Sequence, residues 1–163
     1  MRQDDLKSMI RRHRLWLDTE GREGARAMFS GANVVGQAFW RADLRQACLD
    51  RANLTGCNLD HASLCEASLR DVRLNSASLW QADLRKADLS NADLRRAKLD
   101  HADLRDAALN GANVTDATFW GARLDNADLR SVTGLTSDQL KNAQVNPETQ
   151  HSPGAVHREP LRS

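Results

Sequence analysis

The sequence predicts a solenoid, a fold in which short repeated units stack along one axis, and two observations carry this prediction. First, residues 26–130 divide into 21 consecutive blocks of five residues without an insertion. Second, the fourth position of a block is Leu in 16 of the 21 blocks, and the second position is Ala in 18. A period of five matches neither the 3.6 residues of a helical turn nor the two-residue alternation of a flat strand. Each block therefore buries one large and one small apolar residue, and stacked blocks share a continuous core.

The blocks RADLR, QADLR, KADLS, NADLR and HADLR resemble those of the pentapeptide repeat proteins, whose consensus is A-[D/N]-L-x-x. The resemblance covers about two thirds of the chain. It implies an all-β solenoid: a right-handed quadrilateral β-helix with one block per side and four blocks per coil, hence about five coils. The sequence also repeats itself over 40 residues, which is two such coils. The outward-facing identities at this offset are Trp40/Trp80, Asp43/Asp83, Arg45/Arg85, Asp60/Asp100 and His61/His101.

The segments on either side of the repeats are predicted to cap the open ends of the solenoid. Residues 1–25 are expected to form a capping helix and linker, with Gly21 ending the helix. Its apolar face holds Leu6, Met9, Ile10, His13, Trp16 and Leu17. Residues 131–146 are expected to form a second cap, in which Thr136 and Gln139 make a capping box for a short helix from about Ser137 to Val145. Residues 147–163, which contain all three prolines, are predicted to be a disordered tail.

Composition excludes several classes of protein. The chain has 23 Lys and Arg against 22 Asp and Glu, so its net charge of +1 recruits neither nucleic acid nor an anionic membrane. No apolar run approaches the roughly 18 residues of a membrane-spanning helix, and the opening MRQDDLKSMIRRHRLW is too charged for a signal peptide. Three cysteines without an export signal favour reduced thiols and a cytoplasmic location.

No catalytic, cofactor or metal site is predicted. An enzyme needs convergent groups in a concave pocket, whereas a solenoid filled by Leu and Ala has flat or convex sides. Cys57, His61 and Cys65 lie four residues apart, which raises the question of zinc. In the repeat phase they fall at an inward position, a corner and the following side, so they do not converge on one centre. The sequence therefore predicts a protein that is not an enzyme and needs no cofactor.

The repeats carry 14 basic and 14 acidic residues, so no basic stripe for nucleic acid is present. Asp43, Asp83 and Asp103 are each followed two residues later by Arg45, Arg85 and Arg105, which predicts self-neutralised pairs. Some pentapeptide repeat proteins resemble a DNA duplex in shape and acidity and bind in the DNA-binding saddle of DNA gyrase. This chain lacks net acidity, so a role as a gyrase or topoisomerase modulator is only the alternative function.

One outward feature stands out from the rest of the repeats. Trp40, Trp80 and Trp120 are 40 residues apart, and Asp60 and Asp100 fall between them at intervals of 20. His61 and His101 follow the two aspartates. Large rigid aromatic side chains are enriched at binding hot spots. The sequence thus predicts a protein–protein interaction module whose surface here contacts a partner protein or a second copy, unless the Trp residues only cover the coil.

Overall fold

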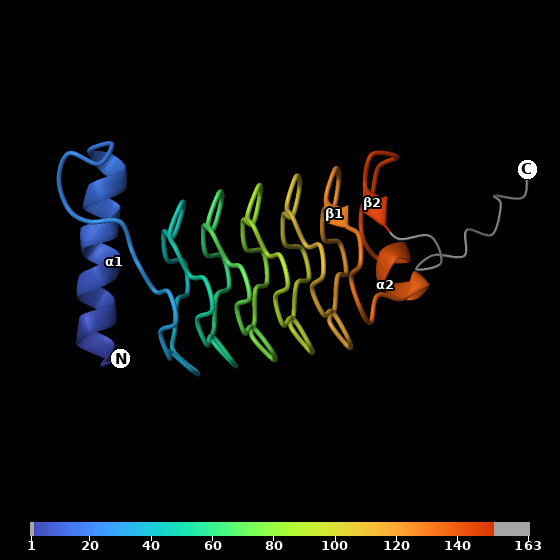
Figure 1. Cartoon of the computed structure of the whole chain (residues 1–163), viewed down its shortest axis with the longest axis horizontal. Helices are drawn as coiled ribbons and strands as arrows, with labels where there is room; N and C mark the ends of the chain where they lie inside the picture. The colour runs from blue at the N-terminus through green and yellow to red at the C-terminus, as the bar shows by residue number, and fades with distance from the viewer. Residues whose placement is uncertain (1, 152–163) are drawn as a thin grey trace, which may run out of the picture.

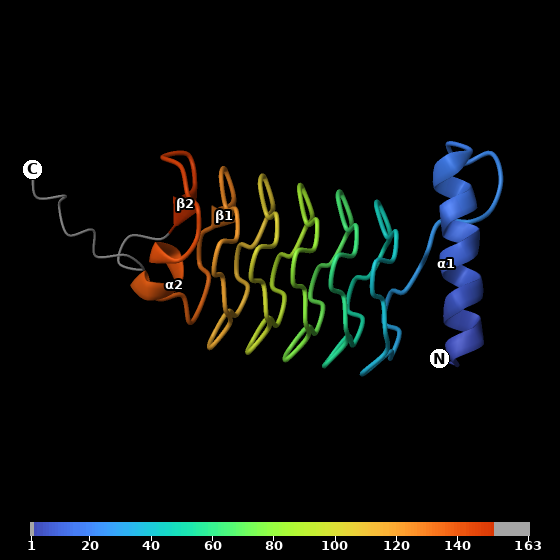
Figure 2. The ribbon, with the colours of Figure 1, turned by 180° about the vertical axis from the view of Figure 1, so that it is seen from behind.

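The repeats form a stack of coils with a period of 20 residues in the computed structural model, which describes residues 2–151. Parallel β-bridges join residues 20 apart, from Met28 with Cys48 to Asn113 with Thr133. Within residues 26–130 each bridging residue is the third of its block, so blocks that are four apart along the chain pair with each other. Figures 1 and 2 show the coils as successive turns along one axis. Within the described residues, only β1 (Asp128–Leu129) and β2 (Gln150–His151) extend beyond a single bridge.

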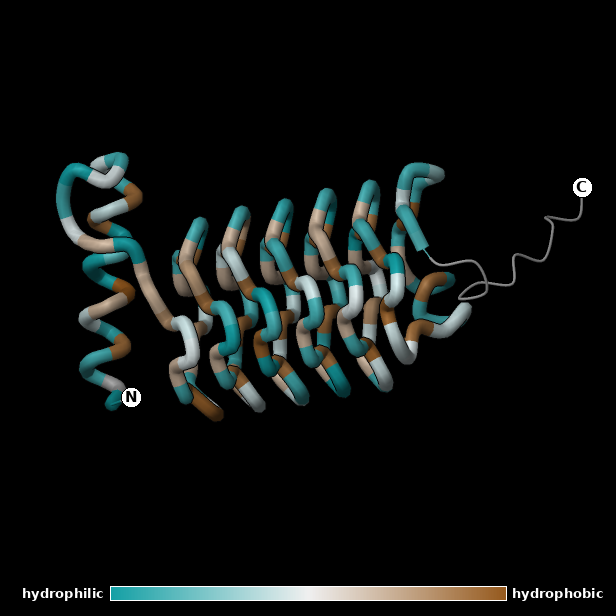
Figure 3. Tube along the Cα trace, viewed as in Figure 1, coloured by the Kyte–Doolittle hydropathy of each residue, from teal (hydrophilic) through white to brown (hydrophobic). Residues whose placement is uncertain are grey.

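The core runs along the centre of the stack and has the predicted phase. All 16 Leu residues at fourth positions are buried, and so are the second-position Ala residues apart from the half-buried Ala32. Hydrophobic positions recur at matching places in successive coils (Figure 3). Backbone hydrogen bonds fix the spacing of the coils: Leu84 N–H donates to Asp103 C=O at 2.8 Å, and Asp103 N–H donates to Ala82 C=O at 2.9 Å. The interior is thus one continuous column of buried side chains, as a packed solenoid requires.

Each corner of a coil is a four-residue turn with a left-handed residue at its third position. At one corner, Ala82 N–H donates to Leu79 C=O at 3.0 Å, and Gln81 between them has a φ of 54°. Sixteen corner residues from Arg41 to Ser131 have positive φ without being glycine. In a single turn this position favours Gly or Asn, because a left-handed backbone brings Cβ close to the carbonyl oxygen. The stacked hydrogen bonds therefore hold most of these corners in a conformation that their side chains do not favour, Asn91 and Asn126 being the exceptions.

This strain can be measured at the corner residue Arg96, which is exposed and has a φ of 58°. Arg96→Val should lower the free energy of unfolding by about 1–2 kcal/mol relative to Arg96→Gly, because a β-branched residue is a backbone outlier there. Lys98→Val is the matched control, since Lys98 is exposed at a bridge position where β-branched residues are well tolerated. Urea denaturation of the three variants checks the prediction, and equal stabilities for Arg96→Val and Arg96→Gly would contradict it.

Helix α1 (Gln3–Asp18) lies across the N-terminal end of the stack (Figure 1). Its residue Leu6 is buried, and Met9 and Ile10 pack against the core. The chain then turns at Gly21, whose φ is +85° and whose N–H donates to Trp16 C=O at 2.8 Å. At Gly24, with a φ of +77°, the returning chain touches α1 so closely that an added Cβ would collide with the Arg12 carbonyl oxygen.

His13 joins α1 to the edge of the first coil. Its ring is fully buried and stacks on Trp16. The Nδ1 atom accepts a hydrogen bond from Ala27 N–H at 3.0 Å, and Nε2 donates to Arg45 C=O at 3.0 Å. These two partners require a neutral imidazole with its proton on Nε2. Burial lowers the pKa of His13 below its ordinary value of 6.5. A side chain thus satisfies two backbone groups that the open end would leave unpaired.

Beyond Arg130 the winding continues. Helix α2 (Ser137–Lys141) begins with the predicted capping box of Thr136 and Gln139. The Gln139 amide also donates to the carbonyl groups of Val114 and Ala117, at 3.0 and 2.8 Å, so it satisfies the last coil as His13 does the first. The helix ends at Lys141, not at Val145 as expected, because Gln144 N–H donates to Ala122 C=O and re-enters the ladder opposite Arg123.

Strand β2 corrects the expected extent of the disordered tail. It pairs in parallel with β1, with Asp128 opposite Gln150 and Leu129 opposite His151. Thr149 is buried and donates its hydroxyl to Leu124 C=O at 2.8 Å. The expectation of disorder is therefore wrong for Thr149, Gln150 and His151. Residues 152–163 of the expected tail lie outside the described residues. Over residues 2–151, no helix has the length and apolar character needed to cross a membrane.

Candidate functional site

The Trp column consists of Trp40, Asp60, Trp80, Asp100 and Trp120, which occupy the same corner in successive coils because one coil has 20 residues. The three Trp side chains are among the largest exposed apolar groups, at 57%, 40% and 63% of full exposure. Adjacent Trp residues lie two coils apart, about 10 Å along the rod. Such a regular row of exposed aromatic rings is a candidate interaction surface.

Asp60 and Asp100 hold the backbone of the Trp residue in the next coil. The Asp60 carboxylate accepts a hydrogen bond from Trp80 N–H at 3.0 Å, and Asp100 accepts one from Trp120 N–H at 2.9 Å. Ser78 and Thr118 donate their hydroxyl groups to the same two carboxylates. The aspartates between the rings are therefore structural acceptors within the column.

The two histidines predicted for this surface support the Trp rings. The His61 ring meets Trp80 edge to face, with centroids 4.8 Å apart and planes at 85°. His101 meets Trp120 in the same way, at 4.7 Å and 87°. Each Asp–His pair thus fixes both the backbone and the ring of the Trp one coil later. The sequence signal for this arrangement is the dipeptide Asp-His, whose Asp lies 20 residues before each of these two Trp residues. The sequence places these residues on the same surface but does not predict that they contact the Trp.

Trp40 belongs to the first coil and lacks this support. No coil precedes it, and its exposed ring instead contacts the Arg41 guanidinium, whose Cζ lies 5.1 Å from the ring centroid. The contact is a cation–π interaction. The column therefore contains two supported rings and one ring at the open end of the stack.

The side next to the Trp column carries the predicted self-neutralised pairs. Arg45 donates to both carboxylate oxygens of Asp43, at 2.8 and 2.7 Å. Arg85 makes the same pair of bonds with Asp83, and Arg105 with Asp103. These hydrogen bonds from arginine lower the pKa of Asp43 and Asp83 below the ordinary value. The prediction of paired charges is confirmed, and the side offers no uniform field of either sign.

The three cysteines are free thiols and do not meet at one point. Cys57 is buried in the core, where its Sγ donates to Val34 C=O at 3.0 Å, and burial raises the pKa of this thiol. His61 lies at the Trp column, and Cys65 lies one corner further along the coil. Within residues 2–151, no group of three or more His, Cys, Asp or Glu side chains is placed to hold a metal ion.

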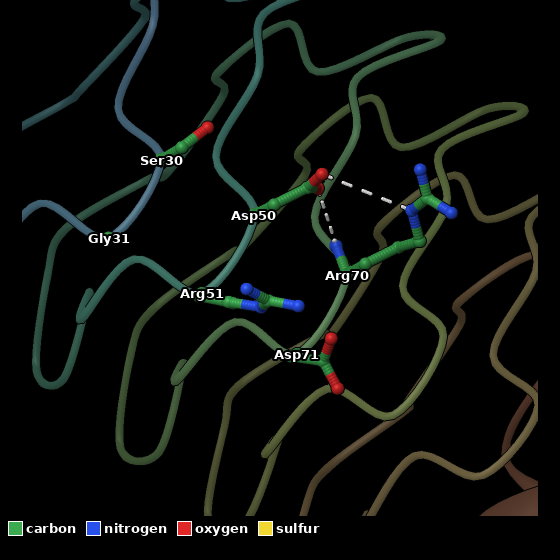
Figure 4. A pocket seen from close by; sticks show the side chains of 6 residues that line it. All are labelled: Ser30, Gly31, Asp50, Arg51, Arg70 and Asp71. Atoms are coloured by element: carbon green, nitrogen blue, oxygen red, sulfur yellow. Dashed lines mark hydrogen bonds and ion pairs between the residues drawn. The ribbon is translucent and has the colours of Figure 1, made fainter.

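A hollow at another corner is lined by Ser30, Gly31, Asp50, Arg51, Arg70 and Asp71. Figure 4 shows Asp50 and Arg70 linked across two coils. The Asp50 carboxylate accepts from Arg70 N–H at 3.1 Å, and the Arg70 guanidinium lies 3.9 Å from it. Two acids and two arginines balance each other in this hollow, so it has no net charge with which to attract an ion.

Stacked 20-residue coils with a Leu and Ala interior define a solenoid scaffold whose outer positions are available for recognition. A family model for pentapeptide repeats matches eight copies within residues 47–79, 67–106 and 107–133, more than half of the chain. The chain belongs to the pentapeptide repeat family. No functionally curated protein sequence matches the chain.

Solved structures of the same family are similar to this chain. HetL, a pentapeptide repeat protein involved in heterocyst differentiation regulation from Nostoc sp. strain PCC 7120, is 31% identical over 80% of this chain, with a TM-score of 0.55. This match spans 54% of HetL. The Nostoc PCC 7120 protein alr5209 is 34% identical over 66% of this chain and 86% of its own, with a TM-score of 0.56. QnrB1, a plasmid-mediated fluoroquinolone resistance protein, is 18% identical over 78% of this chain and 70% of its own, with a TM-score of 0.55, a likeness of fold alone.

Proposed function

We propose that the protein is a non-catalytic protein–protein interaction module: a right-handed, four-sided rod of about five coils that presents the Trp column to another protein or to a second copy. The observation that carries this proposal is the fixation of exposed aromatic rings by the Asp–His pairs. A ring that is already ordered loses little conformational freedom on binding, so its buried area contributes more to affinity.

The arrangement of the column suits a protein partner. Exposed Trp rings recur every second coil, with the shorter Asp side chains in the coils between them. Apolar groups of a partner can enter between the rings, and an indole N–H can donate a hydrogen bond to the partner. Because the carboxylates already accept backbone hydrogen bonds, we expect the rings to supply most of the binding energy.

The surface charges favour this function over mimicry of DNA. A DNA mimic needs a surface dominated by carboxylates, and the repeats carry equal numbers of acids and bases. Several of those acids are held in two-bond pairs with arginine. A gyrase or topoisomerase modulator therefore stays the alternative, and a binding assay with DNA gyrase at low and physiological salt distinguishes it.

Trp80→Ala tests the proposed function. We expect it to weaken self-association or partner binding by about 2 kcal/mol or more, while the free energy of unfolding falls less than for a core Leu→Ala variant. Arg73→Ala is the matched control, since Arg73 is exposed at a bridge position on another side. Sedimentation equilibrium measures self-association, and affinity capture compares partner binding of the two variants. If Trp80→Ala leaves both unchanged, the rings only cover the coil.

A further inference from the structure

The first coil has an open backbone edge between Ala38 and Asp43. Residues 78–83 occupy the same position two coils later. Five backbone hydrogen bonds join them to the segment 57–64 of the coil before them. The five corresponding groups of the first coil have no partner among residues 2–151: the N–H and C=O groups of Ala38 and Asp43, and the C=O of Trp40. Such an edge is a template on which another extended chain can pair.

The same comparison shows what is missing around Trp40. Trp80 N–H donates to Asp60, and the His61 ring lies against the Trp80 ring. Neither partner exists for Trp40, whose N–H has no acceptor within the described part of the chain. Trp40 is therefore a half-site, and the later coils define the missing half as a carboxylate followed by an imidazole on an extended backbone.

Helix α1 leaves room for that missing segment. A groove of about 600 Å³ separates the helix from the edge, with Ile10 and Arg14 on the helical wall and Trp40 and Asp43 on the other. The bond from His13 to Arg45 C=O closes the ladder just beyond Asp43. The open part of the edge thus has a defined length, from Ala38 to Asp43.

The charges at the groove favour an acidic segment. Arg45 is committed to Asp43 through two hydrogen bonds. Arg41 has no carboxylate partner among residues 2–151, since its guanidinium lies over the Trp40 ring. Arg14 and Asp18 both line the groove and pair with each other, the Arg14 Nε lying 3.9 Å from the Asp18 carboxylate. Among the described residues that line the groove, Arg41 is therefore the one charge without an opposite partner, and it lies beside the Trp40 ring.

We propose that this edge binds an extended segment of a partner protein that carries Asp or Glu directly followed by His or an aromatic residue. The segment adds as a parallel strand to Ala38–Asp43, its carboxylate accepts from Trp40 N–H, and its ring packs on the indole. This is β-strand addition, in which backbone bonds supply affinity and side-chain positions supply specificity. The inference rests on the proposed function, because Trp40 is the first member of the Trp column.

The chain itself supplies a probe. A blocked peptide with the sequence NLDHASL, residues 58–64, has the backbone and the Asp–His pair that dock on Trp80 within the protein. Titrated into the labelled full-length chain, it should shift the amide signals of residues 38–43 and the indole N–H signal of Trp40. Trp40→Ala should weaken its binding about tenfold. Trp120→Ala should leave the affinity unchanged, because Asp100 and His101 already occupy the carboxylate and imidazole positions at Trp120.

Two altered peptides test the mode of binding. N-methylation of the three amides equivalent to Leu59, His61 and Leu64 should weaken binding about tenfold or more, because these amides donate to the open edge. Asp60→Asn with His61→Ala in the peptide should weaken it by a similar factor. Equal affinity of the N-methylated peptide, or no binding at about 1 mM, overturns the proposal.

The peptide titration also distinguishes the edge site from the proposed function and from self-association of the protein. If the signals of residues 38–43 shift when the protein concentration alone is raised, the occupant is a second copy and the proposal of a partner segment is wrong. If the peptide fails to bind while Trp80→Ala still abolishes an interaction, the further inference fails and the proposed function stands. If the peptide binds while Trp80→Ala has no effect, the proposed function fails and the edge site stands.

Discussion

Leu84→Ala should lower the free energy of unfolding by about 2–5 kcal/mol, because truncation of a buried Leu leaves a cavity that its surroundings fill only in part. Leu84 is fully buried in the middle of the stack, and the backbone ladder on both sides fixes the spacing of its coil. The coil cannot collapse onto the cavity without breaking bonds to its two neighbours. We therefore expect the cost to lie toward the upper end of this range, measured by urea denaturation.

The neighbouring residue provides the control. Arg85 points outward and pairs with Asp83, so Arg85→Ala should cost no more than about 1 kcal/mol, as for other exposed ion pairs. The two substitutions are adjacent in sequence but lie on opposite sides of the coil wall. Equal losses of stability would mean that the inward and outward positions are wrongly assigned.

Loss of the His13 cap should have an effect of similar size. His13→Ala leaves Ala27 N–H and Arg45 C=O without their partners at a buried contact, at a cost of about 1–3 kcal/mol for each group. The exposed first coil should also promote aggregation, because an uncapped edge pairs with other chains. Thermal denaturation and light scattering of the variant measure the two effects.

The wild-type protein should lose stability in mild acid for the same reason. Burial lowers the pKa of His13 in the folded state, so below pH 6.5 the unfolded chain takes up a proton that the buried ring refuses. The His13 contribution is therefore complete above pH 6.5 and declines as the pH falls toward the lowered pKa. His13→Gln removes this titration, so its loss of stability between pH 7.5 and 5 should be smaller than that of the wild type. A parallel decline in both proteins would contradict the assignment.

The sequence predicts most of the backbone because the repeat is rigidly phased. Inward Leu and Ala positions, the capping box at Thr136 and the Asp–Arg pairs all follow from spacing alone. The end of the winding does not. Gln144 and Gln150 rejoin the ladder 21 and 22 residues after their partners, and a five-residue pattern cannot register such shifts.

The candidate site is predicted only in outline. The period of 20 places the Trp residues in one column, but spacing does not say which groups a carboxylate binds. Asp60 was expected to face a partner, whereas it accepts Trp80 N–H from the next coil. The open half-site at Trp40 is visible only by comparison with Trp80 and Trp120, because its defining property is a neighbour that the first coil lacks.

The 20-residue period also restricts how the chain can change in length. Loss or gain of one residue within the repeats rotates every later block out of its column and sends Leu outward. Loss of one whole coil keeps the core intact but disturbs the Trp column: removal of 61–80 would turn the order Trp, Asp, Trp, Asp, Trp into Trp, Asp, Asp, Trp. Only a change of 40 residues preserves both the core and the alternation. The unit in which this surface can be lengthened or shortened without losing its pattern is thus two coils.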